Sequence, residues 1–209
     1  ANSAYTKNLA ISKGVSQDKI AVINPGISPI DEINKKTLQK VESLLKVKTP
    51  RLITVSRFDK RKNHEKVIMS LRNLKQKYPD IVYICIGYGD EEDNLKKLVQ
   101  ELNLNSQVMF FKDISNDLKN TLLAKSDIFV MPSIIHKKSV EGFGIAYVEA
   151  AQYGVPSLGG KDGGASDAIN HNKTGLICDG NNLDDIHSSL NSMIENKKYL
   201  EFGKNAKEF

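Results

Sequence analysis

The sequence predicts an α/β protein with a Rossmann-like, doubly wound parallel sheet. About six units of a strand followed by a helix run in series along the 209 residues, and such alternation favours parallel strands joined by right-handed crossovers. The apolar runs are short and nearly continuous, which is typical of strands covered by helices on both faces.

The expected strands are short apolar runs, several of which end in a glycine or proline turn. "IVYICIG" is the clearest, because a continuous apolar run of this length is typical of a buried parallel strand. "KIAVINPG" is the first and ends in a Pro-Gly turn. The expected strands are residues 19–26, 51–57, 81–87, 107–111, 127–133, 155–159 and 174–179.

The expected helices show apolar residues at helical spacing or carry helix start and stop signals. In "NHEKVIMSLRNLKQKYP", Val67, Ile68 and Leu71 have this spacing, and Pro79 ends the helix. "DEEDNLKKLVQELNL" has acidic residues in its first turn, where the helix dipole favours them. The expected helices are residues 33–46, 63–79, 90–104, 115–126, 144–153 and 184–209, the last as one or two helices, with a helix start at 163–170.

Composition limits the partners and the location of the protein. The net charge is +5, from 30 basic and 25 acidic residues that are interspersed, which gives little support for nucleic acid and suits an anionic small ligand. Cys85 and Cys178 each lie in an apolar run, so we expect buried, reduced thiols, as in a cytosolic protein. No apolar run reaches the roughly 18–20 residues of a membrane span, and no signal peptide is recognisable.

A cluster of cations follows the strand expected at 51–57. Arg57, Lys60, Arg61 and Lys62 lie within six residues, where the chain enters a helix. Arginine suits bidentate contact with phosphate and lysine supplies a point charge, so this loop could bind a pyrophosphate. The alternative interpretation is a solvated basic loop.

The stretch "EGFGIAYVEA" follows the strand expected at 127–133. Gly142 and Gly144 allow close approach of the backbone to a ligand, and amides at a helix start bind anions. Helical side chains lean toward the N-terminus, so we expect Glu149 to reach back toward such a ligand and accept from ribose hydroxyls. A solvated helix position is the alternative for Glu149.

Glu141 and Glu149 could instead form a hydrolytic acid–base pair. Eight helical residues rise by roughly 12 Å. That separation exceeds what glycoside hydrolases use, so we expect the two carboxylates to contact different parts of one long ligand.

Gly163 and Gly164 follow the strand expected at 155–159. They open a third helix start at the same edge of the sheet and offer further amides. A Gly-Gly pair alone is a weak signal, because most such pairs mark turns.

Taken together, these features resemble a known family. Its motifs match Arg57 with Lys62, the E-x7-E pair formed by Glu141 and Glu149, and "GVPSLGGKDGGASDAINHNKTGLICDG". They look like the donor-binding half of retaining glycosyltransferases with the GT-B fold, in the mannosyltransferase and sucrose-synthase-like family (glycosyl transferases group 1). The resemblance covers nearly the whole chain, and "VEGFGIAYVEA" with the later "GVP" and "GG" is similar to phosphatidylinositol mannosyltransferases.

The resemblance implies a role for each matching residue. Arg57 and Lys62 would hold the donor diphosphate and stabilise charge on the leaving group, and Glu141 would bond hydroxyls of the transferred sugar. These three are the expected catalytic residues. The expected donor-binding residues are Gly142, Phe143, Gly144, Ile145, Glu149, Ile114, Asn116, Gly163 and Gly164.

The chain departs from the family pattern at two positions. The backbone at Ile114 and the side chain of Asn116 match the base-reading loop, but the family commonly has glycine where Lys112 stands. It commonly has glutamate where Asp167 stands, and we assign Asp167 no role beyond a possible helix cap or sugar contact.

The implied reaction is retaining transfer of a hexose through an oxocarbenium-like centre, with catalysis by positioning and charge stabilisation. GDP-mannose is the favoured donor and UDP sugars are the alternative, while the acceptor would be a glycan or lipid. We expect no cofactor and no metal, since Arg and Lys can neutralise the phosphates. Of the scattered histidines, His64 and His136 lie near the expected mouth of the site.

The resemblance also implies a division of the chain. Residues 1–28 would be the segment that leaves an absent amino-terminal acceptor domain, and residues 29–209 the donor-binding domain, with the boundary between 28 and 34. We therefore expect a fragment that is inactive alone, from a cytoplasmic enzyme that can attach to the inner face of the membrane through the absent domain.

Three alternatives belong to other classes. A sugar-nucleotide epimerase would carry more carboxylates and histidines facing the sugar, and a phosphorylase would need a lysine for pyridoxal phosphate. A non-catalytic nucleotide-binding module would keep the fold alone, but Arg57, Lys62, Glu141 and Glu149 are all present.

Overall fold

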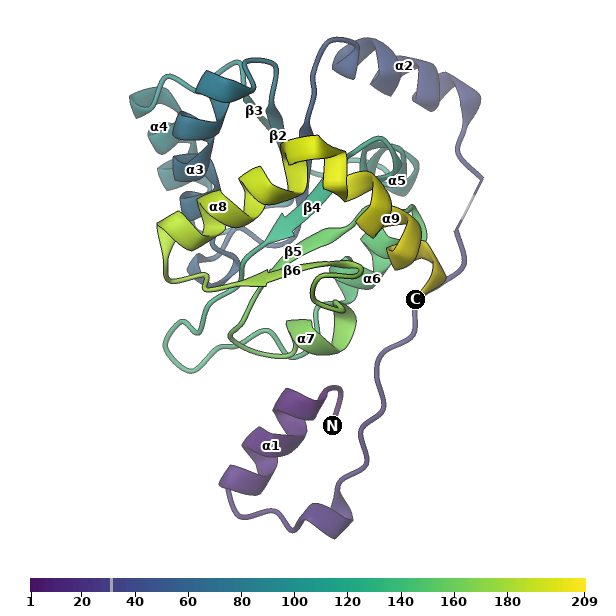
Figure 1. The fold of residues 1–209 in the computed structure, drawn as a ribbon, viewed down its shortest axis with the longest axis vertical. Coiled ribbons are helices and arrows are strands. Elements are labelled where there is room, and N and C mark those ends of the chain that lie inside the picture. Colours follow the sequence, from purple (N-terminus) through teal and green to yellow (C-terminus); the bar gives the residue numbers. More distant parts are fainter. Residues whose placement is uncertain (31) are drawn as a thin grey trace.

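The computed structural model describes residues 1–30 and 32–209, and it confirms the parallel α/β sheet (Figure 1). The strands form one sheet in the order β3-β2-β1-β4-β5-β6, and neighbouring strands are parallel. Since the order reverses between β1 and β4, their carboxyl ends lie at a topological switch point, where such sheets bind ligands. The strands are β1 (Arg51–Val55), β2 (Val82–Ile86), β3 (Val108–Phe111), β4 (Ile128–Met131), β5 (Ser157–Gly160) and β6 (Gly175–Cys178).

Helices cover both faces of the sheet, and each face has its own apolar core. One core includes buried side chains of α3, α4, α8 and α9, and the other those of α2, α5, α6 and α7. The helices are α1 (Ala4–Ser12), α2 (Lys35–Leu45), α3 (His64–Lys77), α4 (Glu92–Glu101), α5 (Asn116–Ala124), α6 (Ile145–Gln152), α7 (Ala165–Ala168), α8 (Leu183–Ile194) and α9 (Lys198–Glu208), with short 3₁₀ helices η1 (Gln17–Lys19), η2 (Lys60–Lys62) and η3 (Glu195–Lys197).

The central strands explain why the apolar runs are continuous. Leu52 and Tyr83 belong to one core, while the next residues along their strands, Ile53 and Ile84, belong to the other. Successive side chains of a strand point to opposite faces, so a sheet with two cores needs apolar residues at every position.

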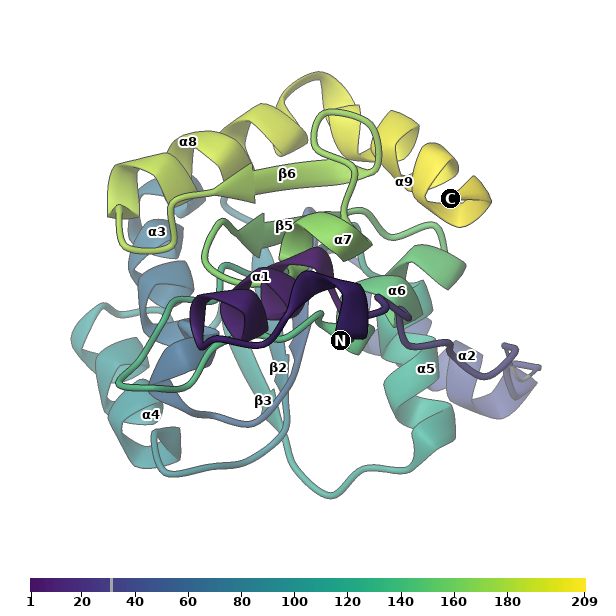
Figure 2. The same cartoon turned by 90° about the horizontal axis from the view of Figure 1, so that it is seen from below.

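The helix α1 lies outside both cores, beyond the edge of the sheet and beside α7 (Figure 2). Ser3 caps α1, and the backbone N–H of Ala4 donates to Asp167 at 2.8 Å. Asp167 therefore helps to hold the start of α1 against α7.

The expected strand at 19–26 is wrong. The chain forms η1 and then runs extended, with Ile23 76% exposed. Beyond the bonds of η1, the segment bonds to the N-terminal residues: Ala1 N donates to Ala21 O, Ile23 N to Ala1 O, and the side-chain amide of Asn24 to Asn2 O. The sequence of this segment suits a strand, but no neighbouring strand among the described residues offers the hydrogen bonds that a strand needs.

Two further expectations are refined. The helix start at 163–170 gives only the four residues of α7. The closing segment forms two helices, because Asn196 and Lys197 have positive φ angles of 55° and 54°, which an α-helix cannot include. The expected domain boundary at 28–34 includes residue 31, which lies outside the described residues, and the division there stays a prediction.

Two predictions made from the composition can be compared with the structure. Cys85 and Cys178 are buried free thiols, as expected. Within residues 1–30 and 32–209, no helix combines the length and the apolar composition needed to cross a membrane.

Hydrogen bonds link a series of polar side chains beneath the carboxyl end of β1. The ring of His64, 2% exposed, contacts Tyr83 Oη through Nδ1 at 2.8 Å and Ser56 Oγ through Nε2 at 3.0 Å. Tyr83 Oη lies 2.7 Å from Thr54 Oγ1. Burial, and secondarily the charge of Lys62, lowers the pKa of His64 to about 3, so the ring is neutral and belongs to the core rather than to the mouth of a site.

This buried histidine predicts a pH dependence of folding stability. The unfolded chain binds a proton at His64 below about pH 6.5, while the folded chain does so only near pH 3, so stability falls as the pH falls through this window. Between pH 6.5 and 4.5 we expect this group to remove about 2 kcal/mol of the free energy of unfolding. Urea unfolding at several pH values measures it, and a His64→Gln variant with the same pH slope as wild type would contradict it.

Candidate functional site

The loops singled out in the sequence meet at the carboxyl edge of the sheet. η2 follows β1, the segment that carries Glu141 follows β4, and the Gly163–Gly164 turn follows β5. Glu141 contacts Lys62 from the first loop and bridges to Gly163 from the third. The expected convergence of these three loops is therefore confirmed.

The loop after β1 is fixed by its own caps. Asp59 Oδ1 accepts the backbone N–H of Lys62 at 3.1 Å and so starts η2. Asn63 follows with a left-handed φ of 62°, and its side-chain amide donates to Pro132 O at 2.9 Å and Gly180 O at 2.8 Å. Because Asn63 ties the loop to the ends of β4 and β6, the cations of η2 are held in place.

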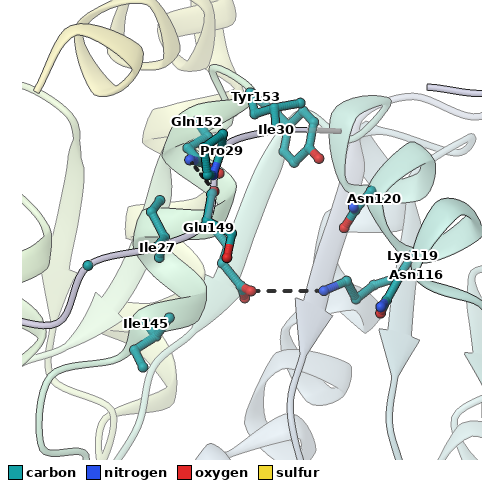
Figure 3. A pocket seen from close by; sticks show the side chains of 12 residues that line it. Ile27, Pro29, Ile30, Asn116, Lys119, Asn120, Ile145, Glu149, Gln152 and Tyr153 are labelled. Atoms are coloured by element: carbon teal, nitrogen blue, oxygen red, sulfur yellow. Dashed lines mark hydrogen bonds and ion pairs between the residues drawn. The ribbon is translucent and has the colours of Figure 1, made fainter. Parts of the chain in front are cut away.

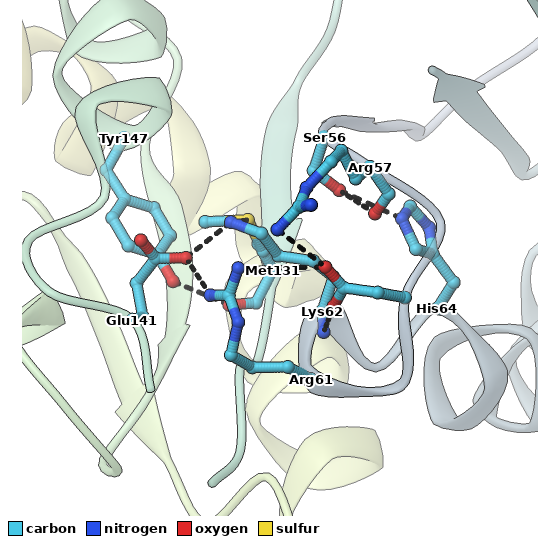
Figure 4. A network of polar contacts seen from close by, with 9 residues as sticks. Ser56, Arg57, Arg61, Lys62, His64, Met131, Glu141 and Tyr147 are labelled. Carbon is cyan, nitrogen blue, oxygen red and sulfur yellow. Dashed lines mark hydrogen bonds and ion pairs between the residues drawn. The ribbon is translucent and has the colours of Figure 1, made fainter. Parts of the chain in front are cut away.

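Glu141 lies at the centre of an ion cluster (Figure 4). Its Oε2 accepts from Arg61 Nη1 at 2.8 Å and from Lys62 Nζ in a close contact. The side chain of Glu141 is only 12% exposed. Burial alone would raise the pKa of Glu141, but the charges and hydrogen bonds of Lys62 and Arg61 together lower it. The carboxylate is therefore ionised at neutral pH.

Arg57 lies apart from this cluster. Its side chain is 73% exposed, and Nη2 pairs with Asp59 at 3.5 Å. With Arg61 and Lys62 it makes three cations around two carboxylates, Asp59 and Glu141. Within this group the cations exceed the carboxylates by one charge, which favours an anionic ligand.

The paired glycines let two loop backbones touch. The N–H of Gly164 donates to Glu141 O at 2.8 Å. A Cβ at Gly164 would stand 2.1 Å from Gly142 O, and one at Gly163, where φ is +110°, would stand 2.4 Å from Glu141 O. The pair is therefore required for packing that positions Glu141. The four-residue α7 that follows is too short for a helix N-terminal anion site of its own.

Two cavities adjoin at Ile145, the first residue of α6. The one beside the ion cluster measures about 300 Å³. Its lining includes Lys62, Met131, Glu141, Gly142, Phe143 and Gly144. The other measures about 370 Å³ and lies between α5, α6 and the segment 26–30 (Figure 3). Since both contain Ile145, they can hold two parts of one elongated ligand.

The second cavity contains Glu149 and Asn116, as the resemblance implied for a nucleoside. Glu149 is partly exposed and pairs with Lys119 Nζ at 3.9 Å across the cavity (Figure 3). Ile114 does not line either cavity, and its side chain packs against the core that includes α5. Its expected contact was through the backbone, and this stays a prediction.

The prediction that eight helical residues separate Glu141 from Glu149 is wrong. α6 begins at Ile145, after Gly144 with a φ of +90°, so Glu141 lies in the preceding loop. A Cβ on Gly144 would stand 2.3 Å from the ring of Tyr147, which explains why glycine occupies this turn. The carboxylates still lie in different cavities.

Sequence reasoning missed three residues that build the site. The sequence does not distinguish Arg61 from the cations around it, although Arg61 is the arginine that contacts Glu141. Lys119 gave no signal, because a lysine on an amphipathic helix is ordinarily solvated. Asn2 lines the first cavity from the far end of the sequence, and its side-chain amide lies close to Gly142.

The expectation of a metal-free site stays a prediction. Across the part of the chain that the structure describes, no three His, Cys, Asp or Glu side chains gather as metal ligands. His136 lies in the loop after β4, in a bridge with Ser139, and lines neither cavity.

The fold of the sheet matches that of glycosyltransferases with the GT-B fold. The structure of Anabaena Alr3699/HepE in complex with UDP and glucose has a TM-score of 0.83 at 23% identity, covering 100% of this chain and 56% of that one. The C-terminal domain of a glycosyl transferase group 1 family protein (LpcC) from Francisella tularensis has a TM-score of 0.68 at 22% identity, covering 86% of this chain and 91% of that one.

The family follows from the sequence match. Residues 35–209 match the family described as glycosyl transferases group 1, and the chain belongs to this family. A GDP-mannose-dependent alpha-(1-6)-phosphatidylinositol monomannoside mannosyltransferase of Mycobacterium tuberculosis is 29% identical over 147 residues, 69% of this chain and 38% of that protein. The match thus spans less than half of the relative. These comparisons give no support to the epimerase and phosphorylase alternatives.

The contact between the glycine turn and the Glu141 loop can be tested by adding one methyl group. We expect Gly164→Ala to lower the free energy of unfolding by about 2 kcal/mol, because its Cβ meets backbone rather than a side chain that can move. Gly26→Ala is the matched control, since no atom lies within 4 Å of its Cβ. Equal stability of the two variants in urea unfolding would contradict the assigned packing role.

Proposed function

We propose that the chain is the donor-binding domain of a retaining glycosyltransferase that moves a hexose from a nucleotide diphosphate sugar to an acceptor held by an absent amino-terminal domain. The observation that carries this proposal is the pair of adjoining cavities, one beside a cationic cluster and one beside Glu149. A sugar diphosphate and a nucleoside together have this elongated form.

The sugar diphosphate would occupy the cavity beside the ion cluster. Lys62 and the exposed Arg57 would bind the diphosphate and stabilise charge that develops on it as the glycosidic bond breaks. The backbone amides of Gly142, Phe143 and Gly144 would add neutral donors, and Glu141 would accept from hydroxyls of the sugar. The oxocarbenium-like centre would then form beside a carboxylate that is already ionised.

The nucleoside would occupy the cavity beside α5 and α6. Glu149 would accept hydrogen bonds from both ribose hydroxyls, as acidic residues do in other nucleotide sites. Lys119 would have to yield part of its contact with Glu149, which costs little because the pair is long and partly exposed. Asn116 and the backbone at Ile114 would border the base.

GDP-mannose is the favoured donor, because the mannosyltransferase of M. tuberculosis is named as dependent on it. UDP sugars are the alternative, since the Anabaena structure holds UDP and glucose. The acceptor would be a glycan or lipid, and peripheral attachment to the membrane would depend on the absent domain. The Francisella C-terminal domain supports the view that such a domain can be studied apart from its partner.

Nucleotide binding is the first test of this proposal. Titration with GDP, UDP, ADP and their sugars by calorimetry should give micromolar to millimolar binding of one diphosphate. We expect Lys62→Ala and Glu149→Ala to weaken it at least about tenfold, because each removes a charge-assisted contact.

The controls are Lys204→Ala and Glu201→Ala, which remove the same charges from exposed positions on α9. Normal binding by both site variants, with wild-type stability, would show that the site is assigned wrongly.

If donor and acceptor are bound by different domains, the 209-residue chain should bind the donor without transferring its sugar. The cation cluster can stabilise the leaving group, but no acceptor would be held in line with it. Incubation with radiolabelled GDP-mannose and UDP-glucose and with glycan and glycolipid acceptors measures transfer. Labelled product above the level given by the Lys62→Ala variant would contradict inactivity of the chain alone.

A further inference from the structure

Arg61 has a different environment from the other cations of its loop. Its side chain is 10% exposed, whereas that of Arg57 is 73% exposed. Its guanidinium lies between two carboxylates, with Nη1 2.8 Å from Glu141 and Nη2 3.7 Å from Asp59. Its backbone carbonyl accepts from Ile134 N at 2.9 Å. Arg61 is thus fixed at both its side chain and its backbone.

Arg61 and Lys62 share one atom of Glu141. Both donate to Oε2 (Figure 4), so this single oxygen receives two cations. The two cations differ in what else holds them. Besides Glu141, Lys62 Nζ contacts only the sulfur of Met131, at 3.4 Å, among the contacts of the described residues. An ammonium on a flexible stem exchanges partners readily, whereas a planar guanidinium held on two sides does not.

The environment of Lys62 favours its turning to an anionic ligand. The pKa of Lys62 is lowered first by burial and further by the charge of Arg61, while Glu141 and Asp59 act to raise it. A diphosphate would add negative charge beside this ammonium. If Lys62 turned to a diphosphate, Glu141 would still be paired with Arg61.

We propose that Arg61 is a positioning residue that keeps Glu141 ionised and oriented toward the sugar while Lys62 turns to the diphosphate. This inference rests on the proposed function and deepens it. Arg61 acts through Glu141 and makes no contact with the donor. This positioning role predicts that the gain in binding from the sugar depends on Arg61, whereas binding of the diphosphate does not.

Paired titrations separate these two contributions. Each variant is titrated with GDP and GDP-mannose and with UDP and UDP-glucose, and the ratio of the two dissociation constants gives the gain from the sugar. We expect Arg61→Gln to reduce this gain at least fivefold, as Glu141→Gln does, and to change the dissociation constant of the bare diphosphate less than threefold. Arg61→Lys, which keeps the charge, should retain more of the gain than Arg61→Gln.

Several results would overturn the inference. An equal loss for diphosphate and nucleotide sugar in Arg61→Gln would make Arg61 a phosphate ligand. An unchanged ratio in that variant, or equal wild-type affinity for a diphosphate and its sugar, would leave Glu141 and Arg61 without the assigned role.

A measurement without ligand keeps the test independent of nucleotide binding and of the stability of Arg61→Gln. Carboxyl NMR titration of Glu141 in Lys62→Ala should show a carboxylate that stays ionised between pH 5 and 8, because Arg61 still pairs with it. Protonation of Glu141 within this range would overturn the positioning role. Absence of any nucleotide binding by wild type would instead count against the proposed function alone.

Discussion

The organisation of this edge depends on the carboxylate of Glu141 held between Arg61 and Lys62. A buried carboxylate is costly unless it is paired, and here two cations from the loop after β1 pair with it. The loop that carries Glu141 is placed by backbone contact with Gly163 and Gly164, while Asn63 fixes the loop that carries the cations. The sheet brings these loops together because parallel strands end at the same edge.

The two cavities along this edge of the sheet differ in the side chains that line them. The cavity with Lys62 and Glu141 adjoins a group of three cations and two carboxylates, and polar side chains of α5 and α6 contribute to the lining of the cavity with Glu149. Ile145 joins the two. A ligand that is anionic in its middle and rich in hydroxyls at both ends fits this sequence of environments, and a nucleotide sugar has that chemistry.

The sequence was sufficient to predict the fold class, because continuous apolar strands and helical spacing are local patterns. It also predicted that the loops after β1, β4 and β5 gather at one edge, because parallel strands end at the same edge of a sheet. It was insufficient where the outcome depends on distant partners. Residues 19–26 have strand composition but find no partner strand within residues 1–30 and 32–209. The helix α6 begins at Ile145 because Gly144 turns the chain there. Arg61 could not be told from Arg57 by sequence, since their difference lies in burial that only the folded loops create.

The central claim is that one nucleotide sugar spans both cavities, with its diphosphate at the cation cluster. A crystal structure of this chain soaked with GDP-mannose or UDP-glucose tests it most directly. The account predicts phosphate oxygens within hydrogen-bond distance of Lys62, the ribose diol on Glu149 and sugar hydroxyls on Glu141. A nucleotide bound elsewhere on the chain, or one whose ribose lies away from Glu149 while the cavities keep their present form, would contradict it.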